Sequence, residues 1–254
     1  MDTQEHTSII THMLQQTPDD FEWSDINYKA KANKHKKTHI TLTKHIKDAL
    51  NHEKIEGNTM SAIMSAMIKL NLQTYNSLFY PNIKLSQGTF PETHLLKKQI
   101  NSTYLDKNTL SKTQFLAKTY HLIPVFTGPP DNGHWKLAVI KVNKYKKLKT
   151  KLKLQIYDSL AKYTHKDKTT EKVLTTFLKE TYGCTVETTK PFIKQQIDKK
   201  SCGHHTLAIA MAIYHDVNPN RLTPQIIIKL KDYIAFCLIH GYLSKSKFME
   251  FINE

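Results

Sequence analysis

A cysteine stands at the start of a segment that is apolar on nearly every side. Residues 203–214 read GHHTLAIAMAIY, and the apolar character after Thr206 predicts a buried helix. Cys202 directly precedes this segment, and Ser201 before it is a common helix-capping residue type. The unpaired amides and positive dipole end of a helix N-terminus favour a thiolate. Cys202 is therefore a candidate nucleophile, although a buried structural cysteine would fit this position as well.

A histidine and an aspartate occupy matching ends of two predicted strands. His134 precedes the strand predicted over 135–142, and Asp158 follows the strand predicted over 152–157. If these strands pair antiparallel about a turn centred on residue 146, the two side chains meet at one edge of the sheet. The carboxylate could then orient the imidazole and stabilise imidazolium, as in a nucleophilic triad. Each residue taken alone is more often an ordinary surface residue than a member of a catalytic pair.

Acyl transfer also needs hydrogen-bond donors for the developing oxyanion. The backbone N–H of Cys202 is one candidate donor, and the side-chain amide of Gln196, six residues earlier, is another. Gln195 beside it is the alternative. Cys184 and Cys237 lack such a context and are predicted to be structural, and three cysteines make no disulfide framework.

The order of these residues resembles the cysteine proteases that process ubiquitin-like modifiers such as SUMO, and the related adenovirus-type protease. The matching pieces are His134-Trp135, Tyr157-Asp158-Ser159, and Gln196 with Cys202-Gly203. The resemblance implies that Cys202 is the nucleophile and that His134 is the base. It further implies that Asp158 orients His134, that Gln196 lends the oxyanion amide, and that neither cofactor nor metal is required.

The resemblance covers about residues 45–242, and the run 207–222 looks most like a divergent branch found in mobile elements and viruses. Three positions depart from the family pattern. Ala49 replaces a tryptophan that clamps the Gly-Gly tail of the modifier, Ser201 replaces an aspartate, and His204-His205 replaces an apolar pair. These departures concern the substrate more than the reaction, because the four catalytic residue types are intact.

The two adjacent histidines allow two other interpretations. His205 lies three residues after Cys202 on a shared helix face and is an alternative base. Cys202 with both histidines could also form a zinc site, but adjacent helical residues point about 100° apart and seldom bind one ion. We expect His204 and His205 to be solvated or hydrogen-bonded residues of the first helical turn.

The surrounding pattern predicts the elements that position these residues. Helices are predicted over 58–71, 168–181 and 223–238, and strands over 121–126, 135–142, 152–157 and 184–186. This order predicts an α+β fold in which a mixed central sheet over 121–187 is flanked by helices, as in a papain-like cysteine protease of the adenovirus and SUMO-protease type. Residues 1–40 are predicted to be a partly flexible extension, and residues 41–254 the protease domain.

The composition limits the partners. The net charge of +15 over 254 residues favours acidic partners on encounter. Only Arg221 is an arginine, which argues against a specific reader of bases. Codon bias and a selected basic patch are the two explanations of the lysine excess. No apolar run approaches a membrane span and no signal peptide is recognised, so we expect an intracellular protein of the nucleus or cytoplasm with no membrane partner.

These observations together predict a cysteine protease that cleaves peptide or isopeptide bonds through an acyl-enzyme. The expected partner is a protein substrate, either a conjugate of a ubiquitin-like modifier or a polyprotein. Two alternatives stay open. One is a lysine-rich nucleic-acid-binding protein without catalysis, and weak nucleic-acid binding is also compatible with a protease. The other is an acetyltransferase on the same scaffold, in which the same cysteine and histidine would use acetyl-CoA.

Overall fold

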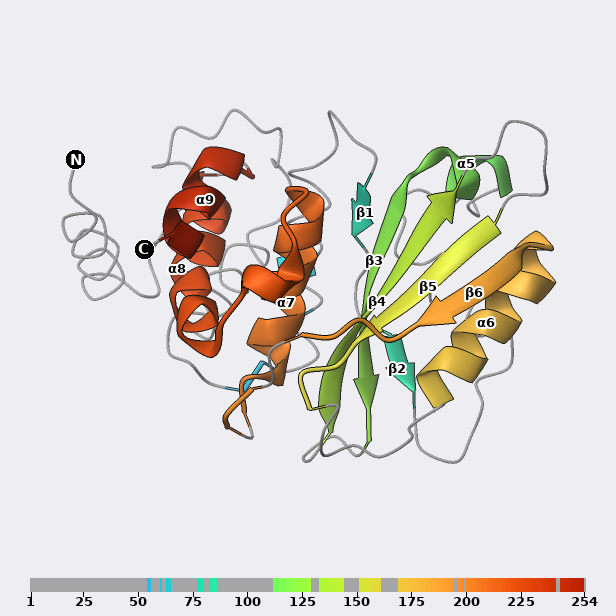
Figure 1. Cartoon of the computed structure of the whole chain (residues 1–254), viewed down its shortest axis with the longest axis horizontal. Coiled ribbons are helices and arrows are strands. Elements are labelled where there is room, and N and C mark those ends of the chain that lie inside the picture. Colours follow the sequence, from blue (N-terminus) through green and yellow to red (C-terminus); the bar gives the residue numbers. More distant parts are fainter. Residues whose placement is uncertain are drawn as a thin grey trace, which may run out of the picture.

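The computed structural model describes a little over half of the chain. The described residues are 54–55, 60, 63–64, 77–79, 83–85, 112–128, 133–143, 151–160, 169–193, 196–198, 200–240 and 243–253. They form a mixed β-sheet with helices packed on both of its faces (Figure 1). The predicted α+β architecture with a mixed central sheet is confirmed.

The sheet contains six strands within the described residues. The strands are β1 (Ser77–Phe79), β2 (Ile83–Leu85), β3 (Tyr120–Thr127), β4 (His134–Asn143), β5 (Lys151–Tyr157) and β6 (Thr185–Thr189). Their order is β1-β3-β4-β5-β6, and β2 also pairs with β3. The strands β3, β4 and β5 form an antiparallel meander, whereas β1, β2 and β6 run parallel to their neighbours.

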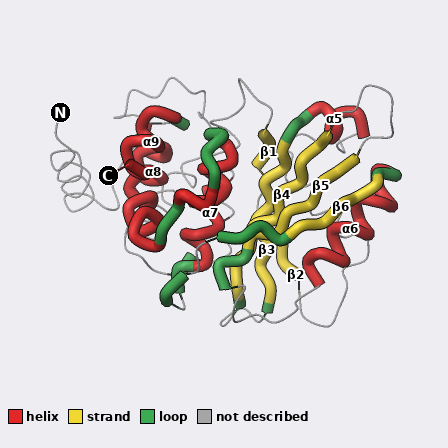
Figure 2. Tube along the Cα trace, in the orientation of Figure 1, coloured by secondary structure: helices red, strands yellow, loops and turns green. Residues whose placement is uncertain are grey.

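Helices divide between the two faces of the sheet (Figure 2). The helices are α5 (Lys112–Ala117), α6 (Thr169–Tyr182), α7 (Cys202–Tyr214), α8 (Pro224–His240) and α9 (Lys245–Asn253), with a short 3-10 helix, η1 (Pro219–Arg221). The helices α5 and α6 pack on one face, and α7, backed by α8 and α9, packs on the other. The sheet therefore separates two apolar cores.

The strand β4 contributes side chains to both cores. Trp135, Leu137 and Val139 pack toward α7, and the alternate residues Ala138 and Ile140 pack toward α6. A strand that is buried on both faces has apolar residues at successive positions rather than at alternate ones. This explains the continuous apolar run LAVI at 137–140 and makes β4 a rigid support for His134 at its start.

The helix α7 is buried on all sides, as the sequence predicts. Every residue from Cys202 to Ile213 is buried, between β4 on one side and α8 on the other. Its apolar composition therefore reflects its place in the centre of one core. The packing fixes the axis of α7 against the sheet and thereby fixes the position of Cys202 at its first turn.

Several expectations fall partly outside the described residues. Of the helix predicted over 58–71, only Met60, Ile63 and Met64 are described, and all three are helical and buried. Residues 1–40 and Ala49 lie outside the described part, so the division at residue 40 stays a prediction. Among the described helices, none has the length and apolar character needed to cross a bilayer.

Candidate active site

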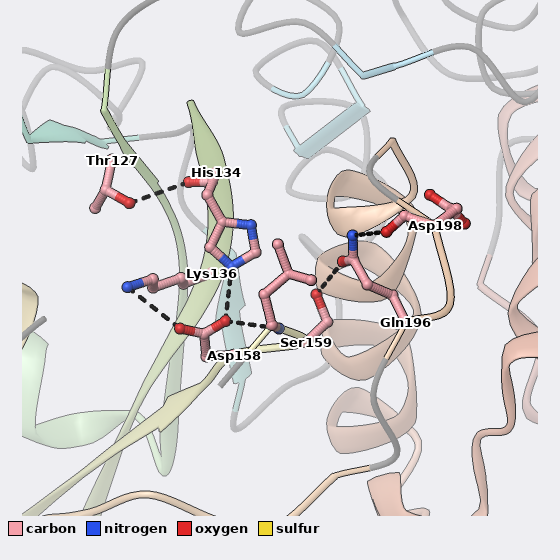
Figure 3. A network of polar contacts seen from close by, with 8 residues as sticks. Thr127, His134, Lys136, Asp158, Ser159, Gln196 and Asp198 are labelled. Carbon is pink, nitrogen blue, oxygen red and sulfur yellow. Dashed lines mark hydrogen bonds and ion pairs between the residues drawn. The ribbon is translucent and has the colours of Figure 1, made fainter. Parts of the chain in front are cut away.

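The imidazole of His134 and the carboxylate of Asp158 are directly bonded. Nε2 of His134 lies 2.6 Å from Oδ1 of Asp158, and the backbone N–H of Leu160 donates to the same oxygen at 2.9 Å (Figure 3). His134 is the first residue of β4 and Asp158 directly follows β5. The structure therefore brings these two residues together at one end of the meander, where the sequence places them.

The strand register differs from the predicted one by a small step. Leu137 pairs with Tyr157, so the next residue, Asp158, lies opposite Lys136 rather than opposite His134. The hairpin midpoint is therefore one residue later than residue 146. His134 and Lys136 are two residues apart on β4 and project to the same side of the sheet. Asp158 can still reach His134 because diagonal neighbours lie within range of long side chains.

The charges of the pair stabilise each other. Burial alone would lower the pKa of His134, but the hydrogen bond and negative charge of Asp158, together with the neighbouring Cys202 side chain, outweigh it and raise the pKa to about 9. Burial would raise the pKa of Asp158, but His134, the Lys136 ammonium and the Leu160 amide hold that pKa far below its usual range. The site therefore favours an imidazolium beside a permanent carboxylate at neutral pH.

Cys202 faces this pair from the N-terminus of α7. Its interaction with the imidazole contributes to the raised pKa of His134, and its side chain is almost fully buried, with the residue only 2% exposed. Since Nε2 of His134 is bonded to Asp158, the second ring nitrogen, Nδ1, remains for the thiol. Nδ1 is buried and forms no complete hydrogen bond to any described residue. Such contacts commonly tighten only when substrate binds.

Gln196 is a buried residue in the largely exposed loop that leads into α7. Its backbone N–H donates to the carbonyl oxygen of Ser159 at 3.1 Å, and the Ser159 hydroxyl donates to its Oε1 at 2.5 Å. Its Nε2 donates to the carbonyl oxygen of Asp198 at 2.7 Å (Figure 3). A primary amide has two hydrogens, so one N–H of Gln196 remains for an oxyanion. The alternative donor, Gln195, lies outside the described residues.

The start of α7 is organised differently from the sequence prediction. Ser201 makes no side-chain capping bond among the described residues, because its backbone angles (φ −82°, ψ 6°) are not those of an extended cap. The carboxylate of Asp198 instead accepts the N–H groups of Lys200 and Ser201, at 2.6 and 2.7 Å. Asp198 therefore fixes the loop between Gln196 and Cys202 from within.

The two histidines of the first helical turn, expected to be solvated or hydrogen-bonded, are buried, which excludes the solvated alternative. The side chains of His204 and His205 are buried because neighbouring elements cover α7 on all sides. Burial lowers the pKa of His205 to about 4, more strongly than the nearby Asp198 raises it. A neutral imidazole of this kind is a weak base, which favours His134 over His205 in that role.

Trp135 beside the site is a core residue that joins two distant segments. It is completely buried and lies against Phe126, with ring centroids 4.9 Å apart. Its Nε1 donates to the backbone carbonyl of Ile55 at 2.8 Å. The side chain of Ile55 in turn packs on Gly203, where an added Cβ would lie 2.7 Å from Cβ of Ile55. The close approach of the Ile55 side chain to the backbone of α7 therefore requires a glycine at position 203.

Two features of the site were missed from the sequence. Lys136 is buried, and its Nζ lies 3.2 Å from Oδ2 of Asp158. The signal was its spacing of two residues from His134 on a strand. Gly133 is the second feature, since an added Cβ there would overlap the ring of Phe126. The turn pattern at 127–133 indicated a loop but not this contact.

The other two cysteines occupy apolar surroundings. Cys184 and Cys237 are both buried free thiols. Burial raises the pKa of Cys184 and raises that of Cys237 to about 12. Neither thiol is activated, in agreement with the structural role expected for both, and Cys202 is the cysteine that lies beside an imidazole–carboxylate pair.

Comparison with known proteins yields one family and several similar folds. No curated protein matches the chain significantly. A structure of the SUMO protease Ulp1, with its catalytic cysteine oxidized to a sulfenic acid, is similar at TM-score 0.56 and 12% identity, covering 96% of this chain and 97% of that one. The C-terminal Ulp1 protease domain in complex with Smt3, the yeast ortholog of SUMO, is similar at TM-score 0.50 and 15% identity, covering 80% and 84%.

These structural similarities establish the fold that the chain shares with Ulp1. The sequence itself matches the Ulp1 protease family, C-terminal catalytic domain, over residues 55–239. This range includes β3 to β6, the loop of Gln196 and the whole of α7. The chain therefore belongs to the Ulp1 protease family and is a cysteine-type peptidase.

Proposed function

We propose that this peptidase cleaves the bond that follows the C-terminal tail of a ubiquitin-like modifier, with Cys202 as nucleophile and His134 as base. The observation that carries the proposal is the 2.6 Å bond between Nε2 of His134 and Oδ1 of Asp158, made beside the thiol at the start of α7. This arrangement leaves Nδ1 of His134 for proton transfer at the sulfur. Asp158 acts through His134 and is a positioning residue.

The reaction begins with the thiolate of Cys202 and the imidazolium of His134. The thiolate attacks the scissile carbonyl carbon, and the oxyanion receives the backbone N–H of Cys202 and the remaining N–H of Gln196. The C–N bond then breaks as His134 transfers its proton to the leaving amine. A water that loses its proton to His134 attacks the resulting thioester, which releases the modifier and restores the thiolate.

The accessibility of the site supports a slender substrate. Cys202 is 2% exposed, and the side chains of His134 and Asp158 are each 12% exposed. An extended tail of small residues reaches a recessed thiol with less steric hindrance than a folded loop does. The structural neighbour in complex with Smt3 is a precedent for such a partner. Conjugates of this kind and a reduced thiol occur together in the nucleus and cytoplasm, where we place the activity.

A panel of electrophilic probes tests the proposal. Each probe carries the C-terminal tail of ubiquitin, SUMO or another modifier ending in an electrophile, and the readout is the mass of the adduct and its position. We expect one modifier probe to label Cys202. The variant Cys202→Ala loses all labelling, and the matched control Cys184→Ala keeps it. Labelling that survives in Cys202→Ala would remove Cys202 as the nucleophile.

The same assay separates the competing functions. If no modifier probe reacts but a generic peptide electrophile labels Cys202, the enzyme is a peptidase of another substrate class, such as a polyprotein. If acetyl-CoA instead acetylates Cys202, the enzyme is an acetyltransferase. A lysine-rich nucleic-acid-binding function predicts steep salt dependence of binding and no effect of Cys202→Ala.

A further inference from the structure

We propose that Lys136 is a positioning residue of this active site, which holds Asp158 in place through its second oxygen and moderates how firmly His134 retains its proton. The inference deepens the proposed catalytic role of Cys202 and His134 and rests on it. It does not depend on which modifier or polyprotein is the substrate.

Lys136 is placed at the site by the pairing of two strands. The register of β4 with β5 sets Asp158 opposite Lys136, while His134 lies two residues earlier on the same side of β4. Residues directly opposite each other on paired strands have their Cβ atoms closest together, so opposite charges at such positions attract strongly. The carboxylate is therefore placed between two cations from one strand, as Figure 3 shows.

Each carboxylate oxygen of Asp158 contacts a different cationic side chain. Oδ1 lies 2.6 Å from Nε2 of His134 and accepts the N–H of Leu160, and Oδ2 lies 3.2 Å from Nζ of Lys136. A carboxylate bonded at one oxygen alone can rotate about its Cβ–Cγ bond. Contacts at both oxygens restrict this rotation, so Oδ1 stays directed at the imidazole.

The burial of Lys136 is costly without this partner. The residue is 3% exposed, and lysine is almost never fully buried unless its charge is paired. The side chain lies next to the apolar positions 135 and 137–140 of β4, where a methionine or leucine would pack without a charge. An ammonium at this position therefore indicates an electrostatic role rather than a packing role.

The electrostatic consequence concerns His134. The ammonium of Lys136 and the imidazolium of His134 share the single negative charge of Asp158. The two cations also repel each other, which makes it easier for His134 to lose its proton. Removal of the Lys136 charge takes away one cation that competes with the imidazolium for the Asp158 carboxylate. The proton on His134 is then held more tightly and is transferred less readily to a leaving amine, while the released carboxylate oxygen is free to turn.

The test measures alkylation of Cys202 by iodoacetamide as a function of pH, in wild type, Lys136→Met and Lys136→Arg. Alkylation displaces iodide with the thiolate and needs no modifier, so it stays informative if the proposed substrate is wrong. We expect the alkaline limb of the profile to move to higher pH in Lys136→Met and to return toward wild type in Lys136→Arg. An unchanged limb in Lys136→Met would overturn the proposal.

A double-variant cycle on probe labelling tests whether Lys136 acts through Asp158. We expect Lys136→Met to slow labelling roughly 10- to 100-fold, and to slow it less than about threefold further when Asp158→Asn is already present. Losses that multiply in the double variant would overturn the proposal, since they would show an independent role.

The matched control is Lys141→Met. This lysine lies on the same strand, its Nζ is 5.5 Å from the ring centroid of Tyr120, and it has no ion pair with Asp158 among those found in the described residues. We expect it to leave both the pH profile and the labelling rate unchanged. Thermal unfolding of each variant confirms that it is folded; if Lys136→Met does not fold, the cycle is repeated with Lys136→Gln, whose outcomes carry the same meaning.

Discussion

The indole N–H of Trp135 donates to the backbone carbonyl of Ile55, a residue 80 positions earlier in the chain. The side chain of Ile55 meanwhile rests on Gly203. Trp135 directly follows His134, and Gly203 directly follows Cys202. Ile55 therefore contacts both the strand that presents the imidazole and the helix that presents the thiol, and this contact helps to set the distance between them.

The contact between Ile55 and Gly203 predicts that Gly203→Ala is strongly unfavourable. The added Cβ would lie 2.7 Å from Cβ of Ile55, which cannot rotate away, so α7 or the Ile55 segment must shift. Overpacking of this kind costs about 1–3 kcal/mol. We expect urea denaturation to show this loss and labelling of Cys202 to slow. The companion change Ile55→Gly should restore part of the labelling rate; wild-type behaviour of Gly203→Ala would contradict the contact.

The protonation of His134 predicts an alkaline limit to activity. Asp158 and Cys202 overcome the effect of burial and raise the pKa of His134 to about 9, so the imidazolium persists through neutral pH and is lost near pH 9. We expect kcat/KM to fall as the pH rises through this value. Asp158→Asn removes the negative charge and should move the limit to lower pH. A limit near 6.5 in the wild type would show that the imidazole is unperturbed.

The same pKa predicts how stability depends on pH. A group whose pKa is raised on folding stabilises the native state fully below its ordinary value of 6.5, and this contribution is lost between 6.5 and about 9. We expect His134→Gln to reduce the pH dependence of unfolding in this interval. Equal slopes in wild type and variant, measured by denaturant unfolding at several pH values, would argue against the raised pKa.

The two candidate bases are separated by a pair of matched substitutions. His134→Gln removes proton transfer and should lower kcat roughly 10²- to 10⁴-fold. His205→Gln alters a buried imidazole whose pKa is about 4 and which is neutral at pH 7, so we expect a change of less than about tenfold. Steady-state cleavage of a fluorogenic substrate, built on the modifier whose probe labels Cys202, measures both. A larger loss in His205→Gln than in His134→Gln would reverse the assignment.

The bonding of Gln196 predicts a selective effect on turnover. Gln196→Ala removes one oxyanion donor and should lower kcat roughly 10- to 1000-fold with little change in KM. Ser159→Ala removes only the hydroxyl that donates to Oε1 of Gln196, so we expect a smaller loss of the same kind. An unchanged kcat in Gln196→Ala would leave the oxyanion to Gln195 or to backbone donors.

Among the expectations that stay predictions, two concern the organisation and ancestry of the chain. One is the boundary near residue 40 between an extension and the protease domain, which falls on residues outside the described part of the chain. The other is the likeness of residues 207–222 to a mobile-element or viral branch of the family. Neither affects the site, because Cys202, His134, Asp158 and Gln196 all lie within the matched range 55–239.

Local sequence patterns were enough to locate the strands and the helix that carry the site. The apolar runs at 121–126, 135–142 and 152–157 correspond to β3, β4 and β5, and the uniformly apolar segment after Cys202 corresponds to α7. Hydrophobic period and turn residues are local properties, so they are readable from one chain. The order of His134, Asp158, Gln196 and Cys202 was readable for the same reason.

Other features of the site depend on contacts between segments that are distant in the sequence. The strand register, which places Lys136 rather than His134 opposite Asp158, depends on how two strands with buried faces pair. The burial of His204 and His205, and the short parallel strands β1 and β2, likewise arise from what lies against them. Because burial and pairing join residues far apart in sequence, local patterns carry little information about them.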